Sequence, residues 1–146
     1  MATYDACTFL DEEHNEVLRL FEQYQAARDE SGRQLLAQKI GRELTVHMQL
    51  EEEIFYPAFR RATHDEALLK DGLEEHEEAR ELIARIENNR VDHGLVLELH
   101  DALLHHINDE RDKMFPKARA TQGLDLMKIA QQLEERKSEL TADHPV

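Results

Sequence analysis

The feature that most constrains the fold of this chain is a repeated spacing. Two segments share it: HMQLEEEIFYP at residues 47–57 and HINDERDKMFP at residues 106–116. Each has a histidine, a glutamate four residues later and a proline six residues beyond the glutamate. A Glu-Glu-His triplet stands upstream of each segment, ending at His14 and at His76. The sequence therefore reads as two diverged halves with the same residue types in the same order.

The composition favours helices in both halves. The 146 residues include 5 glycines, 3 prolines and no tryptophan, and residues of high helix propensity are abundant. Turn-forming residues gather at four places. The sequence thus predicts helices at residues 5–29, 32–61, 65–87, 92–118 and 124–140. We expect one all-α domain, residues 1–146. It is an antiparallel up-down four-helix bundle at about 5–120, with an additional C-terminal helix at about 124–140 that packs on the bundle or on a second subunit.

The charge balance excludes several classes of partner. The chain has 32 acidic and 18 basic residues, for a formal net charge of -14. Such a surface repels phosphate backbones and anionic lipids, so we expect neither nucleic acid nor membrane partners. No apolar run approaches the roughly 20 residues of a membrane span. Cys7 is the one cysteine, which excludes an internal disulfide and makes the cytoplasm the expected location.

Helical periodicity turns polar residues toward the interior. Residues four apart lie about 40° apart around an α-helix, so His47 and Glu51 share a face. That face also contains the apolar residues of the same predicted helix, which must pack in the core. The same reasoning applies in the other three bundle helices. Six polar residues are predicted to point inward: His14, His47, Glu51, His76, His106 and Glu110.

Six such groups in one interior need a partner for their charge. Desolvating an unpaired carboxylate costs several kcal/mol. A metal cation satisfies all six groups, whereas the alternative is a metal-free network of Glu-His ion pairs. Four imidazoles and two carboxylates are too many ligands for one tetrahedral zinc and too rich in nitrogen for calcium or magnesium. Iron, manganese or zinc suit this donor set, and the duplication indicates two metal ions with Glu51 and Glu110 available to bridge them.

These residues resemble the hemerythrin-like, or His-His-Glu cation-binding, family. The resemblance covers about residues 5–120 and includes the ligand order H, HxxxE, H, HxxxE with an aromatic-proline pair after each HxxxE. It implies a four-helix bundle with a non-haem centre of two iron ions bridged by oxo or hydroxo, with zinc or manganese as possible substitutes. The implied metal ligands are His14, His47, Glu51, His76, His106 and Glu110, with both glutamates as bridges.

One residue departs from the oxygen-carrying members of that family. They have a second histidine four residues after the first on the third helix, where this chain has Arg80. The chain is more similar to six-ligand members, which include proteins of iron-sulfur cluster repair, peroxide decomposition and iron sensing. Two functions remain open at this point. One is binding of O2, NO or peroxide as a sensor, scavenger or iron reserve, and the other is redox catalysis in oxidative or nitrosative stress.

For residues near the predicted ligands, we derive the expected roles from their angles around the helix. Glu43, one turn before His47, either accepts the second ring proton of that histidine or forms a boundary salt bridge. Glu52 and Glu53 are predicted to point away from the site. Tyr56 either reaches the site or packs nearby, and its helical angle favours the second place.

The remaining candidates are expected to be structural. Pro57 and Pro116 each remove a helix hydrogen bond and are predicted to kink or end their helices. His105 is predicted to face solvent, about 100° around the helix from His106. Cys7 is expected to fill a small buried apolar position.

Overall fold

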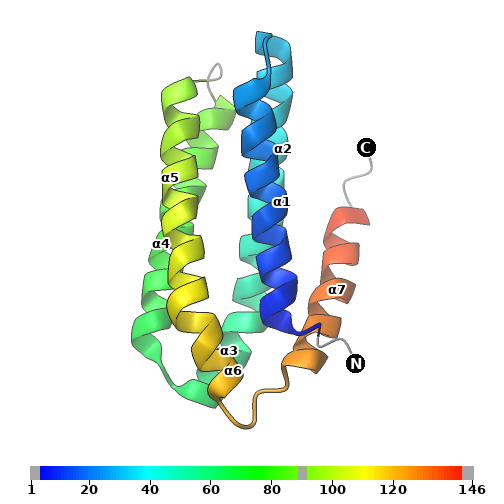
Figure 1. Ribbon diagram of the computed structural model, residues 1–146, viewed down its shortest axis with the longest axis vertical. Helices are drawn as coiled ribbons and strands as arrows, with labels where there is room; N and C mark the ends of the chain where they lie inside the picture. Colours follow the sequence, from blue (N-terminus) through cyan, green and yellow to red (C-terminus); the bar gives the residue numbers. More distant parts are fainter. Residues whose placement is uncertain (1–3, 89–91, 143–146) are drawn as a thin grey trace.

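The computed structural model describes residues 4–88 and 92–142, which form four helical rods and one outer helix (Figure 1). No strand occurs among these residues, and the predicted all-α class is confirmed. The elements are α1 (Ala6–Ala26), α2 (Glu30–Leu50), the π-helical turn η1 (Glu51–Phe55), α3 (Tyr56–Thr63), α4 (Glu66–Asn88), α5 (His93–Asp109), the π-helical turn η2 (Glu110–Met114), α6 (Phe115–Ala120) and α7 (Leu126–Ala142). The second rod is α2-η1-α3 and the fourth is α5-η2-α6.

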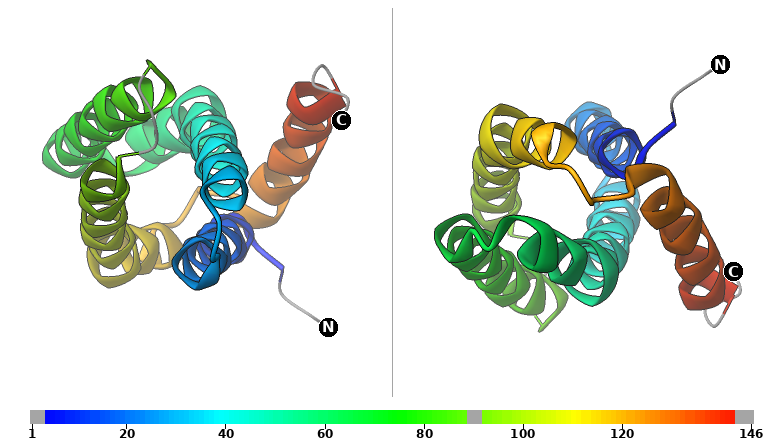
Figure 2. Two further views of the ribbon diagram at one scale, coloured as in Figure 1. Left: turned by 90° about the horizontal axis from the view of Figure 1, so that it is seen from above. Right: turned by 90° about the horizontal axis from the view of Figure 1, so that it is seen from below.

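The rods surround a common axis, with α7 outside them (Figure 2). Helix α7 leans against the side formed by α1 and α2. Its apolar residues Leu126, Ile129 and Leu133 belong to the same buried cluster as Phe55 and Phe59 of the bundle. Of the two packing partners expected for the C-terminal helix, the bundle is the one seen in this chain. None of the described helices is both long enough and apolar enough to cross a bilayer.

Aspartates fix where three helices begin. Asp5 accepts a hydrogen bond from the backbone N–H of Thr8 at 2.8 Å and caps α1. Asp29 caps α2 through Gly32, and Asp92 caps α5 in the same way. A side-chain acceptor at this position satisfies a backbone donor that the helix leaves free. The second rod therefore begins two residues before the predicted residue 32.

The two prolines do not end their helical rods, so the structure excludes one of the two predicted outcomes, a kink or an end. A π-helical turn precedes each one, and in it the backbone N–H of Tyr56 bonds to the Glu51 carbonyl, as Phe115 does to Glu110. This turn holds one residue more than an α-helical turn. Pro57 then lies in the first turn of α3, where a missing N–H is tolerated. The rod continues past Pro57. In the second half, η2 accommodates Pro116 in the same way.

Two apolar clusters fill the bundle and leave a polar layer between them. One includes Leu10, Leu50 and Phe115, and the other includes Val17 and Leu44. The predicted ligands lie at intermediate positions along the same helices. The polar layer is thus sealed by apolar packing on both sides.

Candidate metal centre

The structure brings all six predicted ligand residues into the polar layer. Each rod supplies at least one, and none is more than 5% exposed. The histidines are His14 of α1, His47 of α2, His76 of α4 and His106 of α5, and the glutamates Glu51 and Glu110 are the first residues of η1 and η2. Their inward orientation agrees with the helical phase read from the sequence. Their binding of metal stays a prediction.

The four imidazole rings form two close pairs. The ring centroids of His14 and His47 are 4.8 Å apart, and those of His76 and His106 are 4.9 Å apart. Distances between the pairs are longer, at 6.1 Å from His14 to His106 and 6.4 Å from His47 to His106. Each close pair comes from one half of the sequence.

Glu110 lies between the two pairs. Its Oε1 is 2.8 Å from Nε2 of His14 and 3.1 Å from Nε2 of His106. The carboxylate is fully enclosed, with 2% of the residue exposed. One glutamate from η2 therefore contacts a ring from each half of the sequence.

Glu51 occupies the corresponding place in the other half. Its Oε1 is 3.0 Å from Nε2 of His76 and 3.4 Å from Nε2 of both His47 and His106. Glu51 also contacts rings from both halves. The two glutamates are thus placed as two ligands that could each serve two cations.

Several atoms in this layer make no well-aligned hydrogen bond. They are Nε2 of His14, His47 and His106, Oε2 of Glu51, and both carboxylate oxygens of Glu110, although Oε1 of Glu110 lies 2.8 Å from Nε2 of His14 and forms an ion pair when that ring is protonated. Buried polar atoms in proteins are almost always paired, because leaving one unpaired costs about 1–3 kcal/mol. The unpaired atoms are the nitrogen and oxygen donors that a transition metal uses. The site therefore fits metal cations.

Every ring is also fixed from behind by a carboxylate. The opposite ring nitrogen, Nδ1, lies 2.6–2.9 Å from an acidic side chain in all four histidines. A hydrogen bond donated by Nδ1 leaves the Nε2 lone pair free to face the centre, as in metal sites where a carboxylate orients the ligand. The pairs are His14 with Asp11, His47 with Glu13, His76 with Glu52, and His106 with Glu75.

Two of these carboxylates come from the repeated Glu-Glu-His triplets. Glu13 directly precedes His14, yet it contacts His47 of the next helix. Glu75 likewise precedes His76 and contacts His106. Neighbours in sequence differ by 100° around a helix, so each glutamate faces the adjacent rod. The sequence reasoning missed this role, although the duplicated Glu-Glu-His triplets were a signal for it.

The predictions for the neighbouring carboxylates have different outcomes. Of the two roles open to Glu43, acceptance of the His47 ring proton is excluded, because Glu13 occupies Nδ1 of His47. Glu52, predicted to point away, lies 2.6 Å from Nδ1 of His76. It directly follows Glu51, and like Glu13 and Glu75 it faces the adjacent rod, here α4. Glu53 does face outward and pairs with Arg136.

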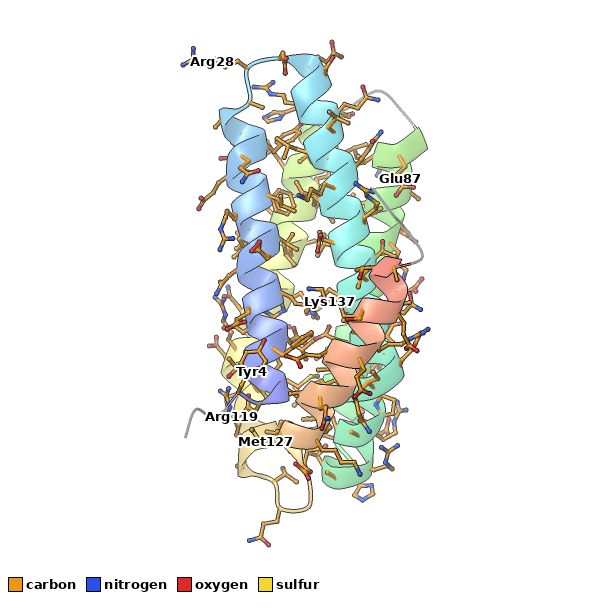
Figure 3. The ribbon with its side chains drawn as sticks, turned by 90° about the vertical axis from the view of Figure 1, so that its right-hand side faces the viewer. Tyr4, Arg28, Glu87, Arg119, Met127 and Lys137 are labelled. Atoms are coloured by element: carbon orange, nitrogen blue, oxygen red, sulfur yellow. The ribbon has the colours of Figure 1, made fainter. Side chains whose placement is uncertain are left out.

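Three cations bind the outer sides of these carboxylates. Arg111 Nε is 2.7 Å from Asp11, Lys137 Nζ is 2.9 Å from Glu13, and Arg80 is 2.9 Å from Glu52. Figure 3 shows Lys137 on α7. Each cation balances a carboxylate that would otherwise add to the negative charge of the centre.

Arg80, which replaces the second histidine of the oxygen-carrying members, lies at the edge of the polar layer. Its side chain is 35% exposed and binds Glu52 and Glu77. It contacts His76 only through Glu52. Burial opposes the negative charge of Glu52, but His76 and Arg80 stabilise that charge and lower the pKa of Glu52 to about 2.

Two of the inner groups carry opposite charges. Burial disfavours a charged His14, but Asp11 and Glu110 outweigh it and raise the pKa of His14 to about 9. Burial likewise opposes ionised Glu110, and His106 and His14 lower its pKa well below the usual range. Without metal, a protonated His14 therefore faces an ionised Glu110. Metal ligation by this ring requires one of its protons to leave.

Tyr56 reaches the centre, which was the less favoured of its two expected places. Its ring stacks on His76 with centroids 5.3 Å apart and planes at 10°. Its hydroxyl is 3.4 Å from Nε2 of His76 and 3.5 Å from Oε1 of Glu51. The extra residue in η1 rotates Tyr56 inward relative to an unbroken α-helix. Burial, with the nearby charge of Glu51, raises the pKa of Tyr56 well above its usual value, so the hydroxyl stays protonated.

A glycine makes room for this hydroxyl. A Cβ on Gly72 of α4 would lie 2.7 Å from the Tyr56 oxygen, closer than real contacts allow. In the other half, Phe115 takes the corresponding place and stacks on His14 with centroids 6.1 Å apart. At this position, Tyr56 against Phe115, the two halves therefore differ by one hydroxyl group.

A small cavity of about 10 Å³ adjoins the centre on the side of α4 and α5. Tyr56, Gly72 and Glu75 line it together with His106 and Glu110. This volume is roughly what a single water molecule needs.

Known proteins were compared with this sequence and fold. Residues 5–118 match the hemerythrin HHE cation binding domain. A hemerythrin HHE cation binding domain-containing protein from Mycobacterium kansasii has a similar structure, with a TM-score of 0.80 and 18% sequence identity. The similarity covers 97% of this chain and 90% of that one. No curated protein sequence matches the chain. The family match spans most of the residues, and the chain belongs to the hemerythrin HHE cation-binding domain family.

Proposed function

We propose that this chain is a non-haem di-iron protein that binds or reacts with O2, NO or peroxide. The observation that carries the proposal is the set of unpaired buried donor atoms on both glutamates and three histidines. Six residues can hold the metals: the pair His14 and His47 for one ion, His76 and His106 for the other, and Glu51 with Glu110 between them.

The pairing of rings supports two metal ions and not one. Each close pair of rings supplies two imidazoles, and each glutamate contacts a ring from both pairs. Iron suits mixed nitrogen and carboxylate ligands, and zinc or manganese are the substitutes that the same donors accept. When bound, two iron ions supply open coordination positions and one-electron chemistry.

The protein's own groups favour a small ligand. The cavity beside Tyr56 has a volume of about 10 Å³, roughly the room for one water molecule, which favours the smallest ligands over larger substrates. The Tyr56 hydroxyl stays protonated and can donate a hydrogen bond at the edge of that cavity. Apolar clusters on both sides keep bulk water out.

A redox enzyme of oxidative or nitrosative stress is the second candidate. Tyr56 favours it, because a buried hydroxyl within 3.5 Å of Glu51 can orient a bound peroxide through a hydrogen bond. The number of equivalents consumed per protein distinguishes a binding protein from an enzyme. A binding protein consumes peroxide or NO at most in proportion to its own amount, whereas an enzyme consumes many equivalents. A cytoplasmic location stays a prediction.

Metal analysis tests the proposal directly. Apoprotein is incubated with excess Fe(II) without oxygen, loosely bound metal is removed, and metal and protein are measured. We expect close to two iron ions per chain. One ion or none would overturn the di-iron assignment.

Exposure to oxygen tests the reactivity. The reduced, iron-loaded protein is exposed to oxygen, its absorption spectrum is recorded, and oxygen is then removed. Arg80 supplies no extra imidazole, so we expect no reversible release of oxygen, and the spectrum should not return without added reductant. Spontaneous recovery would indicate an oxygen carrier.

A further inference from the structure

We propose that Glu75, His105 and Asp109 form a surface site that captures divalent iron and delivers it to the buried centre. The inference rests on the proposed di-iron function and assigns a role to residues outside its ligand set. Glu75 belongs to α4, whereas His105 and Asp109 lie one turn apart on α5. Their ligand atoms all lie within 4.8 Å of one another.

The three donors converge on one point at the surface. Nε2 of His105 is 3.3 Å from Oε2 of Glu75 and 3.4 Å from Oδ2 of Asp109. One imidazole and two carboxylates suit Fe²⁺, Mn²⁺ or Zn²⁺. His105 is 69% exposed, as its helical angle predicts, so an ion can reach it directly from solvent.

The charge of the cluster suits transient capture. Its two carboxylates face one neighbouring cation, Lys113, whose Nζ is 3.7 Å from Oδ1 of Asp109. Lys113 approaches the oxygen that faces away from His105, and so leaves Oδ2 available. Three protein ligands leave an incoming ion partly hydrated. Such an ion can be released again, unlike one held by the buried six.

Glu75 connects this cluster to the buried centre. Its Oε1 accepts a hydrogen bond from Nδ1 of His106 at 2.8 Å, and its Oε2 faces His105. One carboxylate therefore contacts both the exposed cluster and a proposed ligand. The exposed fraction of the side chain alone falls along this line from 69% at His105 to 13% at Glu75 and 7% at His106.

The small cavity continues the same line inward. Glu75 and Asp109 line it at the side of the cluster, and His106 and Glu110 line it at the side of the centre. Oε2 of Glu110 has no hydrogen-bond partner, whereas its Oε1 contacts His14 and His106. An ion leaving the cluster thus meets a carboxylate with one free oxygen next. The cavity is about 10 Å³, so only an ion that has lost most of its water can pass.

The rate of metal uptake tests this route. Anaerobic apoprotein is mixed with less than one equivalent of Fe(II), and a fast colorimetric chelator added at intervals measures the iron not yet buried. We expect His105→Ala with Asp109→Asn to bury iron roughly tenfold more slowly than the unmodified protein, because a charged entrance raises association rates by about 10 to 1,000-fold. Glu75 is left unchanged because it also binds His106.

A charge-matched control separates capture from general attraction. Asp112→Asn removes the same charge as Asp109→Asn from an exposed position outside the cluster, and it should change the rate less than about twofold. His105→Ala alone, on a largely exposed side chain, provides a second test if the double variant unfolds. Equal uptake rates for His105→Ala and unmodified protein would overturn the proposal.

The final iron content distinguishes failure of the entry route from failure of the proposed di-iron function. After prolonged incubation, the double variant should contain as much iron as the unmodified protein. A lower final content would mean that these residues hold resident metal or support the fold, and would overturn the entry route. Failure of the unmodified protein to retain iron would instead refute the di-iron function.

Discussion

Glu13 of α1 accepts a hydrogen bond from Nδ1 of His47 on α2 at 2.8 Å, while its other oxygen lies 2.9 Å from Nζ of Lys137 on α7. One carboxylate thus connects the outer helix to a proposed metal ligand. The family match ends at residue 118, before α7 begins. The C-terminal helix therefore contributes to the orientation of His47 from beyond the matched region.

Removing the charge of Glu13 should weaken metal binding. Glu13→Gln leaves His47 without its carboxylate partner, and loss of such a partner typically costs about 10 to 100-fold in metal affinity. Competition with a chelator of known affinity measures the change. Glu12→Gln is the matched control, because it removes the same charge one residue away and should leave affinity unchanged. Equal affinities for the two variants would show that the contact does not orient His47.

The helical phase of α5 predicts different effects on metal content for substitutions at two adjacent residues, His105 and His106. His106→Ala removes a buried ring beside both glutamates and should lower the final metal content. His105→Ala removes an exposed ring and should leave the final content unchanged, whatever its effect on uptake rate. Metal binds the folded state preferentially, so only His106→Ala should lower the melting temperature of the metal-loaded protein relative to unmodified protein. Equal retention of metal would refute the assignment of His106 as a ligand.

The six inward-facing residues and the bundle followed from α-helical periodicity alone. Each lies among apolar residues of its own helix, and one helix suffices to predict its direction. Glu13 could not be placed this way, because its partner His47 depends on which helix packs beside α1. The repeated triplets contained that information only once the neighbouring helix was known.

Glu52 was misplaced for the same reason as Glu13, because its partner His76 belongs to another rod. The place of Tyr56 depends on a different feature. It follows η1, and the additional residue of a π-helical turn rotates everything beyond it. The same turn lets the rod continue past Pro57. A proline six residues after the glutamate in both halves is the sequence signal for this turn. Recognising it would have placed Tyr56 inside.

The contact between Gly72 and Tyr56 predicts an energetic coupling. Alanine at position 72 gains about 1 kcal/mol of helix propensity, but its Cβ would lie 2.7 Å from the Tyr56 hydroxyl. Overpacking typically costs about 1–3 kcal/mol. Gly72→Ala should therefore be less favourable in the unmodified protein than in Tyr56→Phe, where the hydroxyl is absent. Urea unfolding of the four apoproteins measures this coupling, and additive free energies would contradict the contact.

The cap of α1 predicts a pH dependence away from the metal centre. Asp5 binds Thr8 and Arg119, the latter near the start of α1 (Figure 3). Burial opposes its charge, but these partners lower the pKa of Asp5 below its usual value. A lowered pKa in the folded state stabilises the protein above the unfolded pKa of about 3.9, and this contribution is lost as pH falls through the folded value.

Asp5→Asn isolates that contribution. The variant keeps a capping side chain but loses the charge, so it should be less stable by about 0.5 kcal/mol near pH 7. The difference should stay constant down to about pH 5 and shrink between pH 4 and pH 3, as the carboxylate takes up a proton. Urea unfolding of both apoproteins across this range measures it. A difference that grows toward acid would contradict the assigned direction of the pKa shift.

The hydroxyl that distinguishes the two halves predicts a change in anion binding. Azide, a small anion, can be added to iron-loaded protein as a probe of the cavity beside Tyr56. Tyr56→Phe removes a hydrogen-bond donor while keeping the ring stacked on His76, so metal content should not change. Losing one hydrogen bond worth about 0.5–1.5 kcal/mol should weaken azide binding by roughly 2 to 12-fold. Phe59→Leu, a buried change in the same rod that leaves the hydroxyl in place, should leave azide affinity near that of unmodified protein. Unchanged azide affinity in Tyr56→Phe, with full metal content, would show that the hydroxyl does not face the ligand.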